Sequence, residues 1–167
     1  QIMFPMVGSL EDIRKAKEYL NLAKEQLKER KQQFDEQIRI GIMIEIPAIA
    51  LIADLAAEEV DFASIGSNDL TQYLSAADRM NPEVAAYYKS DSTAMLRLLG
   101  FVFREFSKRE KEISVCGEMA GNPETAQLLV GLGARKLSMS SGNIAGVKAK
   151  LAECTLQELT ALAEKKL

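Results

Sequence analysis

Residues 38–69, IRIGIMIEIPAIALIADLAAEEVDFASIGSND, decide the fold of this chain. They begin with a β-rich apolar run that Pro47 ends, which predicts a buried strand. The following AIALIADLAAEEV predicts an apolar helix with an acidic end, and VDFASIGSND predicts a second strand with a polar loop after it. Strands that are apolar throughout and alternate with helices are typical of a parallel sheet covered by helices.

The same alternation continues on both sides of this stretch. Strands are predicted at QIMFPM and KLSMSSG, and EISVCGEMAG is predicted to be a strand with the loop that follows it. A helical turn is predicted at 70–79, and helices are predicted at 10–34, 82 onward, 93–110, 124–133, 143–153 and 156–167. No linker or domain boundary interrupts the series. Either an open doubly wound sheet or a (β/α)8 barrel could close it.

The number of strands favours only part of a barrel. A complete barrel needs about 250 residues, so five predicted strands in 167 residues correspond to roughly its C-terminal half. The chain also starts without Met, inside a predicted strand. We therefore expect residues 1–167 to form one partial barrel domain.

Composition excludes several classes of function. The net charge is −3, with 47% hydrophobic and 27% charged residues, as in an ordinary globular domain. No basic excess favours nucleic acid binding, and the apolar runs are too short for a membrane span. The start has no signal-peptide pattern, and the two cysteines form no disulfide framework, so a cytoplasmic location is expected. Without histidine, acid–base chemistry falls to Asp, Glu, Cys, Lys or Tyr.

Two carboxylates lie at predicted strand ends, where parallel α/β proteins place their sites. Glu45 interrupts an apolar run, and burying its charge requires a partner or a metal. An ion pair with a helix Arg or Lys is the alternative. Asp69 follows the next strand, where it could instead cap a helix. Together the two carboxylates predict a hard-cation site that suits Mg²⁺.

Two further residues are candidates for chemistry. Cys116 ends a predicted strand beside Gly117, as a working thiol would, although many free cysteines are small buried apolar residues. Arg79 follows Asp69 and could be either solvated or a ligand for phosphate or carboxylate. Cys154 precedes a helix cap and is interpreted as inert. No GxGxxG or Walker motif is present.

Two segments carry a family resemblance. GIMIEIPAIALIADLAAEEVDFASIGSNDLTQYLSAADR (41–79) and VCGEMAGNPETAQLLVGLGARKLSMS (115–140) closely resemble the C-terminal phosphoenolpyruvate-binding domain of enzyme I of the bacterial phosphotransferase system. Pyruvate phosphate dikinase and phosphoenolpyruvate synthase share the wider pattern. The resemblance extends over nearly the whole chain. It leaves the sugar-transport and nitrogen-related branches of enzyme I open.

The resemblance implies a (β/α)8 barrel and a set of residue roles. It implies that Glu45 and Asp69 bind Mg²⁺, that Asn68, Asp69 and Arg79 contact phosphoenolpyruvate, and that Cys116 is the acid–base group at C3 of enolpyruvate. Family members phosphorylate their own histidine from phosphoenolpyruvate, which leaves pyruvate. They then pass the phosphoryl group to a histidine-containing phosphocarrier protein, and they usually dimerise through this domain.

Three departures from the family pattern limit what it implies for this chain. The chain has no histidine, so the phosphohistidine domain is absent from residues 1–167, as are the first barrel strands with further arginines. Ser67 replaces the more usual Thr. Two other readings stay open: a non-catalytic half-barrel for dimerisation or regulation, and a Mg²⁺-dependent 2-oxo-acid aldolase or lyase.

Overall fold

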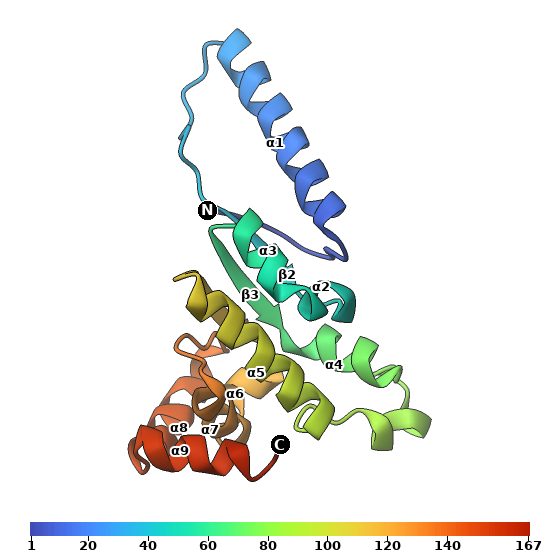
Figure 1. The fold of residues 1–167 in the computed structure, drawn as a ribbon, viewed down its shortest axis with the longest axis vertical. Coiled ribbons are helices and arrows are strands. Elements are labelled where there is room, and N and C mark those ends of the chain that lie inside the picture. Colours follow the sequence, from blue (N-terminus) through green and yellow to red (C-terminus); the bar gives the residue numbers. More distant parts are fainter.

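The computed structural model describes residues 1–167 as an α/β chain built on one parallel sheet (Figure 1). Its strands are β1 (Ile2–Phe4), β2 (Ile40–Ile44), β3 (Phe62–Gly66) and β4 (Glu112–Cys116). They are all parallel, and their order is β1-β2-β3-β4. A doubly wound sheet reverses its strand order at a switch point. These four strands show no reversal, so the predicted parallel α/β class is confirmed and the doubly wound alternative is not favoured.

The two faces of the sheet differ in burial. One face carries Ile42, Ile44, Ala63, Ile65 and Val115, each at most 1% exposed and part of the 26-residue core. Side chains alternate between the faces of a strand, so the intervening residues form the opposite face. That face lines an open cavity of about 520 Å³, to which it contributes Met3, Phe62, Ser64, Glu112, Ser114 and Cys116. The core therefore covers one face and leaves the other accessible.

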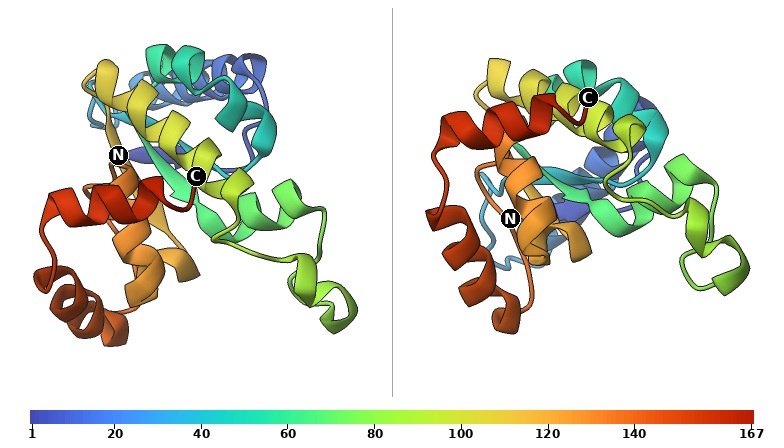
Figure 2. Two further views of the ribbon diagram at one scale, coloured as in Figure 1. Left: turned by 60° about the horizontal axis from the view of Figure 1, so that its bottom comes forward. Right: turned by 90° about the horizontal axis from the view of Figure 1, so that it is seen from below.

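Helices connect the strands and extend beyond them. They are α1 (Leu10–Glu29), α2 (Pro47–Leu51), α3 (Ala53–Glu59), α4 (Ser67–Ser75), the 3-10 helix η1 (Pro82–Tyr87), α5 (Thr93–Lys108), α6 (Glu118–Gly121), α7 (Pro123–Leu132), α8 (Ser141–Ala152) and α9 (Leu156–Glu164). Helix α1 projects from one end of the molecule, and α7, α8 and α9 gather at the other (Figures 1 and 2). No helix combines the length and apolar character that a membrane crossing requires.

Local capping explains where several helices begin. Ser9 and Asp12 form a capping box at the start of α1, and Thr155 and Glu158 form one at the start of α9. The Asn122 side chain accepts hydrogen bonds at the start of α7. Asn81 caps the helix that was predicted from residue 82 onward, but in the structure this helix is the short 3-10 helix η1.

Two predicted elements differ from the structure. The helix predicted at 48–60 is divided at Ile52, whose φ of −115° and ψ of 33° are not helical. The fifth strand was predicted at 136–142 but is only a single bridge from Leu137 to Val115. Lys136, Ser138 and Ser140 are exposed, and α8 begins at Ser141, so little of the segment is available for pairing.

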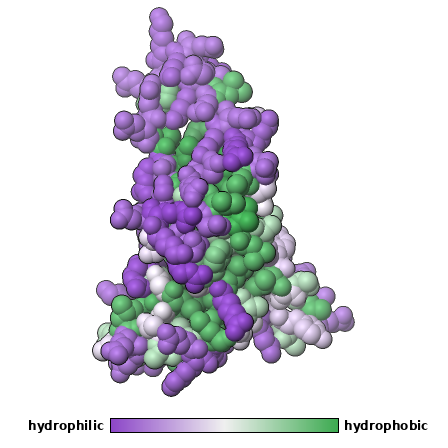
Figure 3. All heavy atoms as spheres, viewed as in Figure 1, coloured by the Kyte–Doolittle hydropathy of each residue, from purple (hydrophilic) through white to green (hydrophobic).

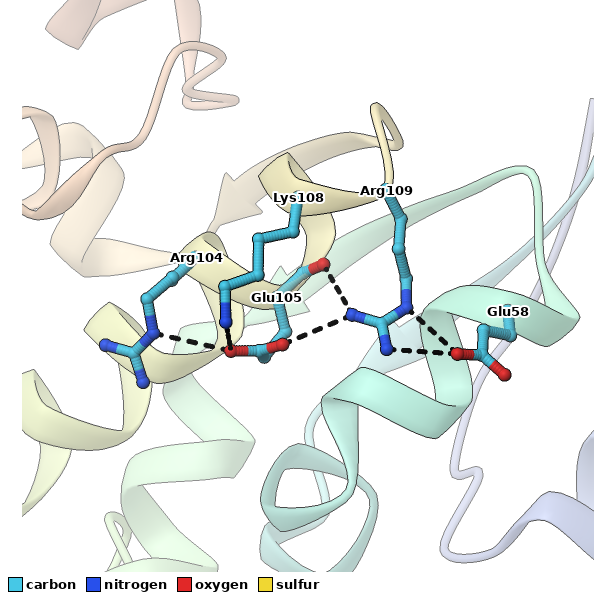
Figure 4. Close-up of polar contacts among 5 residues, drawn as sticks. All are labelled: Glu58, Arg104, Glu105, Lys108 and Arg109. Carbon is cyan, nitrogen blue, oxygen red and sulfur yellow. Dashed lines mark hydrogen bonds and ion pairs between the residues drawn. The ribbon is translucent and has the colours of Figure 1, made fainter.

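A charge cluster fastens α5 to α3 (Figure 4). Glu105 is buried on α5 and accepts from Lys108 at 2.9 Å, Arg109 at 3.2 Å and Arg104 at 3.3 Å. The Lys108 hydrogen bond is the largest cause that lowers the pKa of Glu105. Arg109 also reaches Glu58 on α3, at 3.0 Å. The cluster holds two helices of the covered face in a fixed relation, at the side where β3 and β4 begin.

The outer surface is divided by polarity (Figure 3). Hydrophilic residues cover the end from which α1 projects, and an apolar band runs over the middle of the same face. Leu51 of α2 and Leu55 of α3 are exposed, at 66% and 44%. The covered side of the sheet thus also has apolar residues on its outer surface.

Candidate functional site

Strand register brings three predicted strand ends to one level. Ile44 pairs with Ile65, and Gly66 pairs with Cys116. Glu45 follows Ile44, so it lies opposite Gly66, one strand away from Cys116. Residues at one level of neighbouring parallel strands point to the same face. Glu45 and Cys116 therefore lie on the same side of the sheet, on either side of Gly66, although only Cys116 lines the open cavity.

The carboxylate of Glu45 is buried without an ion-pair partner. Glu45 is 4% exposed, and its Oε1 accepts a hydrogen bond from the backbone N–H of Met6 at 2.8 Å. The predicted alternative, an ion pair with a helix Arg or Lys, is therefore wrong. A Cβ on Gly66 would lie 2.8 Å from Glu45 Oε2. The glycine thus provides the space that this carboxylate occupies.

The turn after β3 is tied to the turn after β4. Ser67 Oγ donates to the backbone carbonyl of Cys116 at 2.6 Å, and Asn68 Oδ1 accepts from the N–H of Glu118 at 3.0 Å. The N-cap of α4 is Gly66, with no side-chain capping bond. The cap interpretation of this turn is therefore wrong. Oδ1 of Asn68 accepts this bond, and the NH₂ group of the same side chain can donate to a ligand.

Gly117 makes this close approach possible. Its φ of +99° lies in the region that favours glycine. A Cβ there would come within 2.5 Å of Ser67 Oγ and 2.8 Å of Asn68 Oδ1. Any side chain at this position would separate the two turns.

Cys116 lies where two cavities meet. It lines the cavity on the open face and a second cavity of about 380 Å³ at the strand ends. Its Sγ lies 3.4 Å from the carbonyl oxygen of Ile65, a direction in which the thiol can donate. Cys154, in contrast, accepts from Gln127 Nε2 at 3.2 Å and lines neither cavity. The two cysteines therefore differ as predicted in their access to the strand ends.

The second cavity contains mostly polar groups. Its lining residues are Asn68, Cys116, Gly117, Glu118, Ser138, Met139, Ser140 and Asn143. Hydroxyl, amide and thiol groups from the ends of β3 and β4, from the segment after Leu137 and from α8 thus converge on one hollow. Such a convergence is typical of a site for a small polar ligand.

Asp69 and Arg79 are not in the lining of this cavity. Asp69 is half-buried in the first turn of α4. Arg79 is exposed in the connection from α4 to η1, and its backbone N–H donates to Gln72 Oε1 at 3.1 Å. The structure thus brings Glu45, Asn68 and Cys116 to the strand ends, with Asp69 next to them, and leaves the guanidinium of Arg79 in solvent.

Tyr88 is a residue of this region that sequence reasoning missed. Its hydroxyl donates to the backbone carbonyl of Asn68 at 3.1 Å. Burial is the largest cause that raises the pKa of Tyr88; Glu118 and Asp69 raise it further, while Arg79 lowers it. Three charged side chains of the region therefore act on one phenol. Nothing in the local sequence distinguishes this tyrosine from the exposed Tyr87 beside it.

The carboxylates suit a magnesium ion that a ligand would complete. No group of three or more His, Cys, Asp or Glu side chains is close enough to hold a metal ion. Mg²⁺ in enzymes is often bound by one or two carboxylates, with water and substrate oxygens in the remaining positions. Glu45 and Asp69 offer that donor chemistry, so these residues fit such an ion without forming a cage of their own.

The parallel sheet and its polar strand ends define an α/β protein with a site for a small polar ligand. Comparison with known proteins identifies its family. The model of the PEP-utilising enzyme, PEP-binding domain family matches residues 1–156. The chain belongs to this family.

Relatives share this region at 41–45% identity. Multiphosphoryl transfer protein 2 of Escherichia coli (strain K12) is 45% identical over 158 residues, which are 95% of this chain and 19% of that protein. The phosphoenolpyruvate-protein phosphotransferase of Bacillus subtilis (strain 168) is 41% identical over 99% of this chain and 29% of its own length. That of Staphylococcus aureus is 43% identical over 98% of this chain and 29% of its own length. The chain therefore spans less than a third of these relatives.

Proposed function

We propose that this chain supplies the phosphoenolpyruvate site of a phosphoenolpyruvate-protein phosphotransferase and forms the C-terminal half of its (β/α)8 barrel. The strand register that puts Glu45 and Cys116 on one face, across Gly66, carries the proposal. Family membership and the names of the relatives support it. The unreversed strand order and the open inner face of the sheet support the barrel.

Glu45 and Asp69 are proposed to hold Mg²⁺. When bound, Mg²⁺ supplies neutralisation of the charge on the phosphate and carboxylate oxygens of phosphoenolpyruvate. The Met6 N–H holds one oxygen of Glu45 and leaves the other directed over Gly66. Asp69 lies in the first turn of α4, directly after the neighbouring strand β3.

Asn68 and Arg79 are proposed to bind the anionic ligand, together with Asp69 through the ion. Asn68 would donate through its NH₂ group, while its side-chain oxygen accepts from the backbone N–H of Glu118. The Arg79 guanidinium is exposed and can offer two parallel hydrogen bonds to a phosphate or carboxylate. Charge neutralisation and positioning of this kind are the main requirements of phosphoryl transfer.

Cys116 is proposed to handle the proton at C3. Transfer of the phosphoryl group to a histidine leaves the enolate of pyruvate. The Cys116 thiol then donates its proton to C3, the carbon–oxygen double bond forms, and pyruvate and a thiolate remain. The reverse step removes a C3 proton from pyruvate. With no histidine in the chain, a thiol at the mouth of the cavity is the suitable donor.

The acceptor and the partners belong to the same proposal. Because the chain has no histidine, the phosphoryl group must pass to a histidine outside residues 1–167, and from there to a histidine-containing phosphocarrier protein. Homodimerisation, a cytoplasmic location and a role in sugar transport or its nitrogen-related counterpart follow the resemblance to enzyme I. None of these proposals involves nucleic acid or a membrane.

Proton exchange tests the role of Cys116 without needing the phosphoryl acceptor. The chain is mixed with pyruvate and Mg²⁺ in deuterium oxide, and loss of the methyl proton signal is followed by nuclear magnetic resonance. We expect exchange with the wild-type chain and with Cys154→Ala, and at least a hundredfold slower exchange with Cys116→Ala. Calorimetry should show that Cys116→Ala still binds phosphoenolpyruvate. Exchange by Cys116→Ala at the wild-type rate would remove this thiol from the mechanism.

A non-catalytic half-barrel is the second candidate. The lack of a complete metal-ligand group and the exposure of Arg79 favour it. It predicts no exchange and no ligand binding by the wild-type chain. An aldolase or lyase acting on 2-oxo acids would instead cleave or form a carbon–carbon bond with pyruvate, which the same spectra would record as a new product.

A further inference from the structure

The connection from Ala76 to Asp91 carries Arg79 but has little core of its own. It begins at the left-handed residue Ala76, with φ of 50°, and no residue of η1 is buried. Without burial, such a segment stays ordered only through specific bonds to the body of the protein. These bonds therefore decide where Arg79 lies.

Side-chain bonds attach the connection near its start, near its end and at its last residue, where Asp91 Oδ2 accepts from Lys166 Nζ at 3.3 Å. Near its start, Gln72 Oε1 accepts from the backbone N–H of Arg79 at 3.1 Å. Near its end, the Tyr88 hydroxyl donates to the carbonyl of Asn68 at 3.1 Å. The first bond joins the connection to α4. The second goes to the first turn of α4, next to Asp69.

We propose that Tyr88 is a positioning residue, whose hydroxyl holds the connection that carries Arg79 against the turn that carries Asn68 and Asp69. The bond is made to a backbone carbonyl, so it fixes the turn itself while the side chains of Asn68 and Asp69 stay available to a ligand. It also closes a loop of chain around Arg79. The consequence for ligand binding rests on the proposed function, but the attachment itself does not.

Tyr88→Phe removes only the hydroxyl, and Tyr87→Phe is the matched control. Tyr87 is the preceding residue, is 70% exposed and makes no side-chain bond to the turn. The first measurement is trypsin digestion of the ligand-free chain. Trypsin can cut the connection after Arg79 and after Lys89. We expect Tyr88→Phe to be cut about five times faster than wild type, the effect of one lost hydrogen bond, while Tyr87→Phe is cut at the wild-type rate. Equal rates for Tyr88→Phe and Tyr87→Phe would overturn the attachment.

The second measurement is calorimetric titration of the same variants with phosphoenolpyruvate in the presence of Mg²⁺. We expect about fivefold weaker binding by Tyr88→Phe and wild-type binding by Tyr87→Phe. Faster cutting of Tyr88→Phe with unchanged affinity would overturn the role in ligand positioning. Faster cutting together with no binding by the wild-type chain would support the attachment and overturn the proposed function.

Discussion

Gly66→Ala tests directly whether the space above this glycine belongs to Glu45. The φ of Gly66 is −80°, which alanine adopts freely, so backbone strain does not enter. The new methyl carbon would lie 2.8 Å from Glu45 Oε2, 3.0 Å from Glu45 Cβ and 3.1 Å from Met43 Sδ. All three separations are shorter than ordinary contacts, so the Glu45 side chain has to move.

The expected cost is about 1–3 kcal/mol, the usual range for one extra carbon in a well-packed region. Movement of Glu45 also lengthens the 2.8 Å bond from the Met6 N–H. Urea denaturation followed by circular dichroism measures the loss as a lower midpoint. The control is Gly142→Ala on α8, where nothing lies within 4 Å of the added carbon and a small gain is expected.

A double-mutant cycle connects this cost to Glu45 itself. In a Glu45→Ala background the carboxylate is absent, so Gly66→Ala should cost about 1 kcal/mol less than it does in the wild type. The reasoning is refuted if Gly66→Ala unfolds at the wild-type midpoint. It is also refuted if its cost is the same with and without the Glu45 side chain.

Two further predictions concern stability away from the site. Gly131→Ala should destabilise the chain by at least about 3 kcal/mol, because the added carbon would lie 2.1 Å from the Leu159 carbonyl oxygen where α7 meets α9. A Gly131→Ala chain with the wild-type thermal midpoint would contradict this prediction, because it would show that the two helices can separate at no cost. The Lys136 hydrogen bond is the largest cause that lowers the pKa of Glu112. The ionised Glu112 carboxylate therefore stabilises the folded chain at pH values above its unfolded pKa, about 4.3. This stabilisation is lost as the pH falls through the lower pKa of the folded state. Denaturation midpoints measured across this acid range should therefore fall less steeply in Glu112→Gln than in wild type, and parallel curves would contradict the assignment.

The central strands could be predicted because their residues satisfy one requirement throughout. The segments 40–44 and 62–66 are apolar on the buried face and bounded by turn residues, so local pattern and tertiary burial agree. The segment 136–142 lacked that agreement, since its alternate residues are exposed and only Leu137 pairs. The break at Ile52 left no mark in the sequence, because both halves of that helix are apolar.

The site was predictable where chemistry conflicts with burial. Glu45 stood out because a carboxylate in an apolar run needs a reason, and Cys116 because it ends a strand. The partners of these residues were not predictable, since they depend on register and on contacts distant in sequence. Ser67 bonds to the Cys116 carbonyl, 49 residues away in the sequence, and Tyr88 bonds to Asn68 from 20 residues away.

Calorimetric titration of the wild-type chain with phosphoenolpyruvate, with and without Mg²⁺, tests the central claim most directly. Glu45→Gln is the companion variant, because it keeps the side-chain shape and removes the charge that the ion requires. We expect saturable binding that depends on Mg²⁺ and is at least tenfold weaker in Glu45→Gln. Equal binding without Mg²⁺ or by Glu45→Gln, or no binding by the wild-type chain at high ligand concentration, would contradict it.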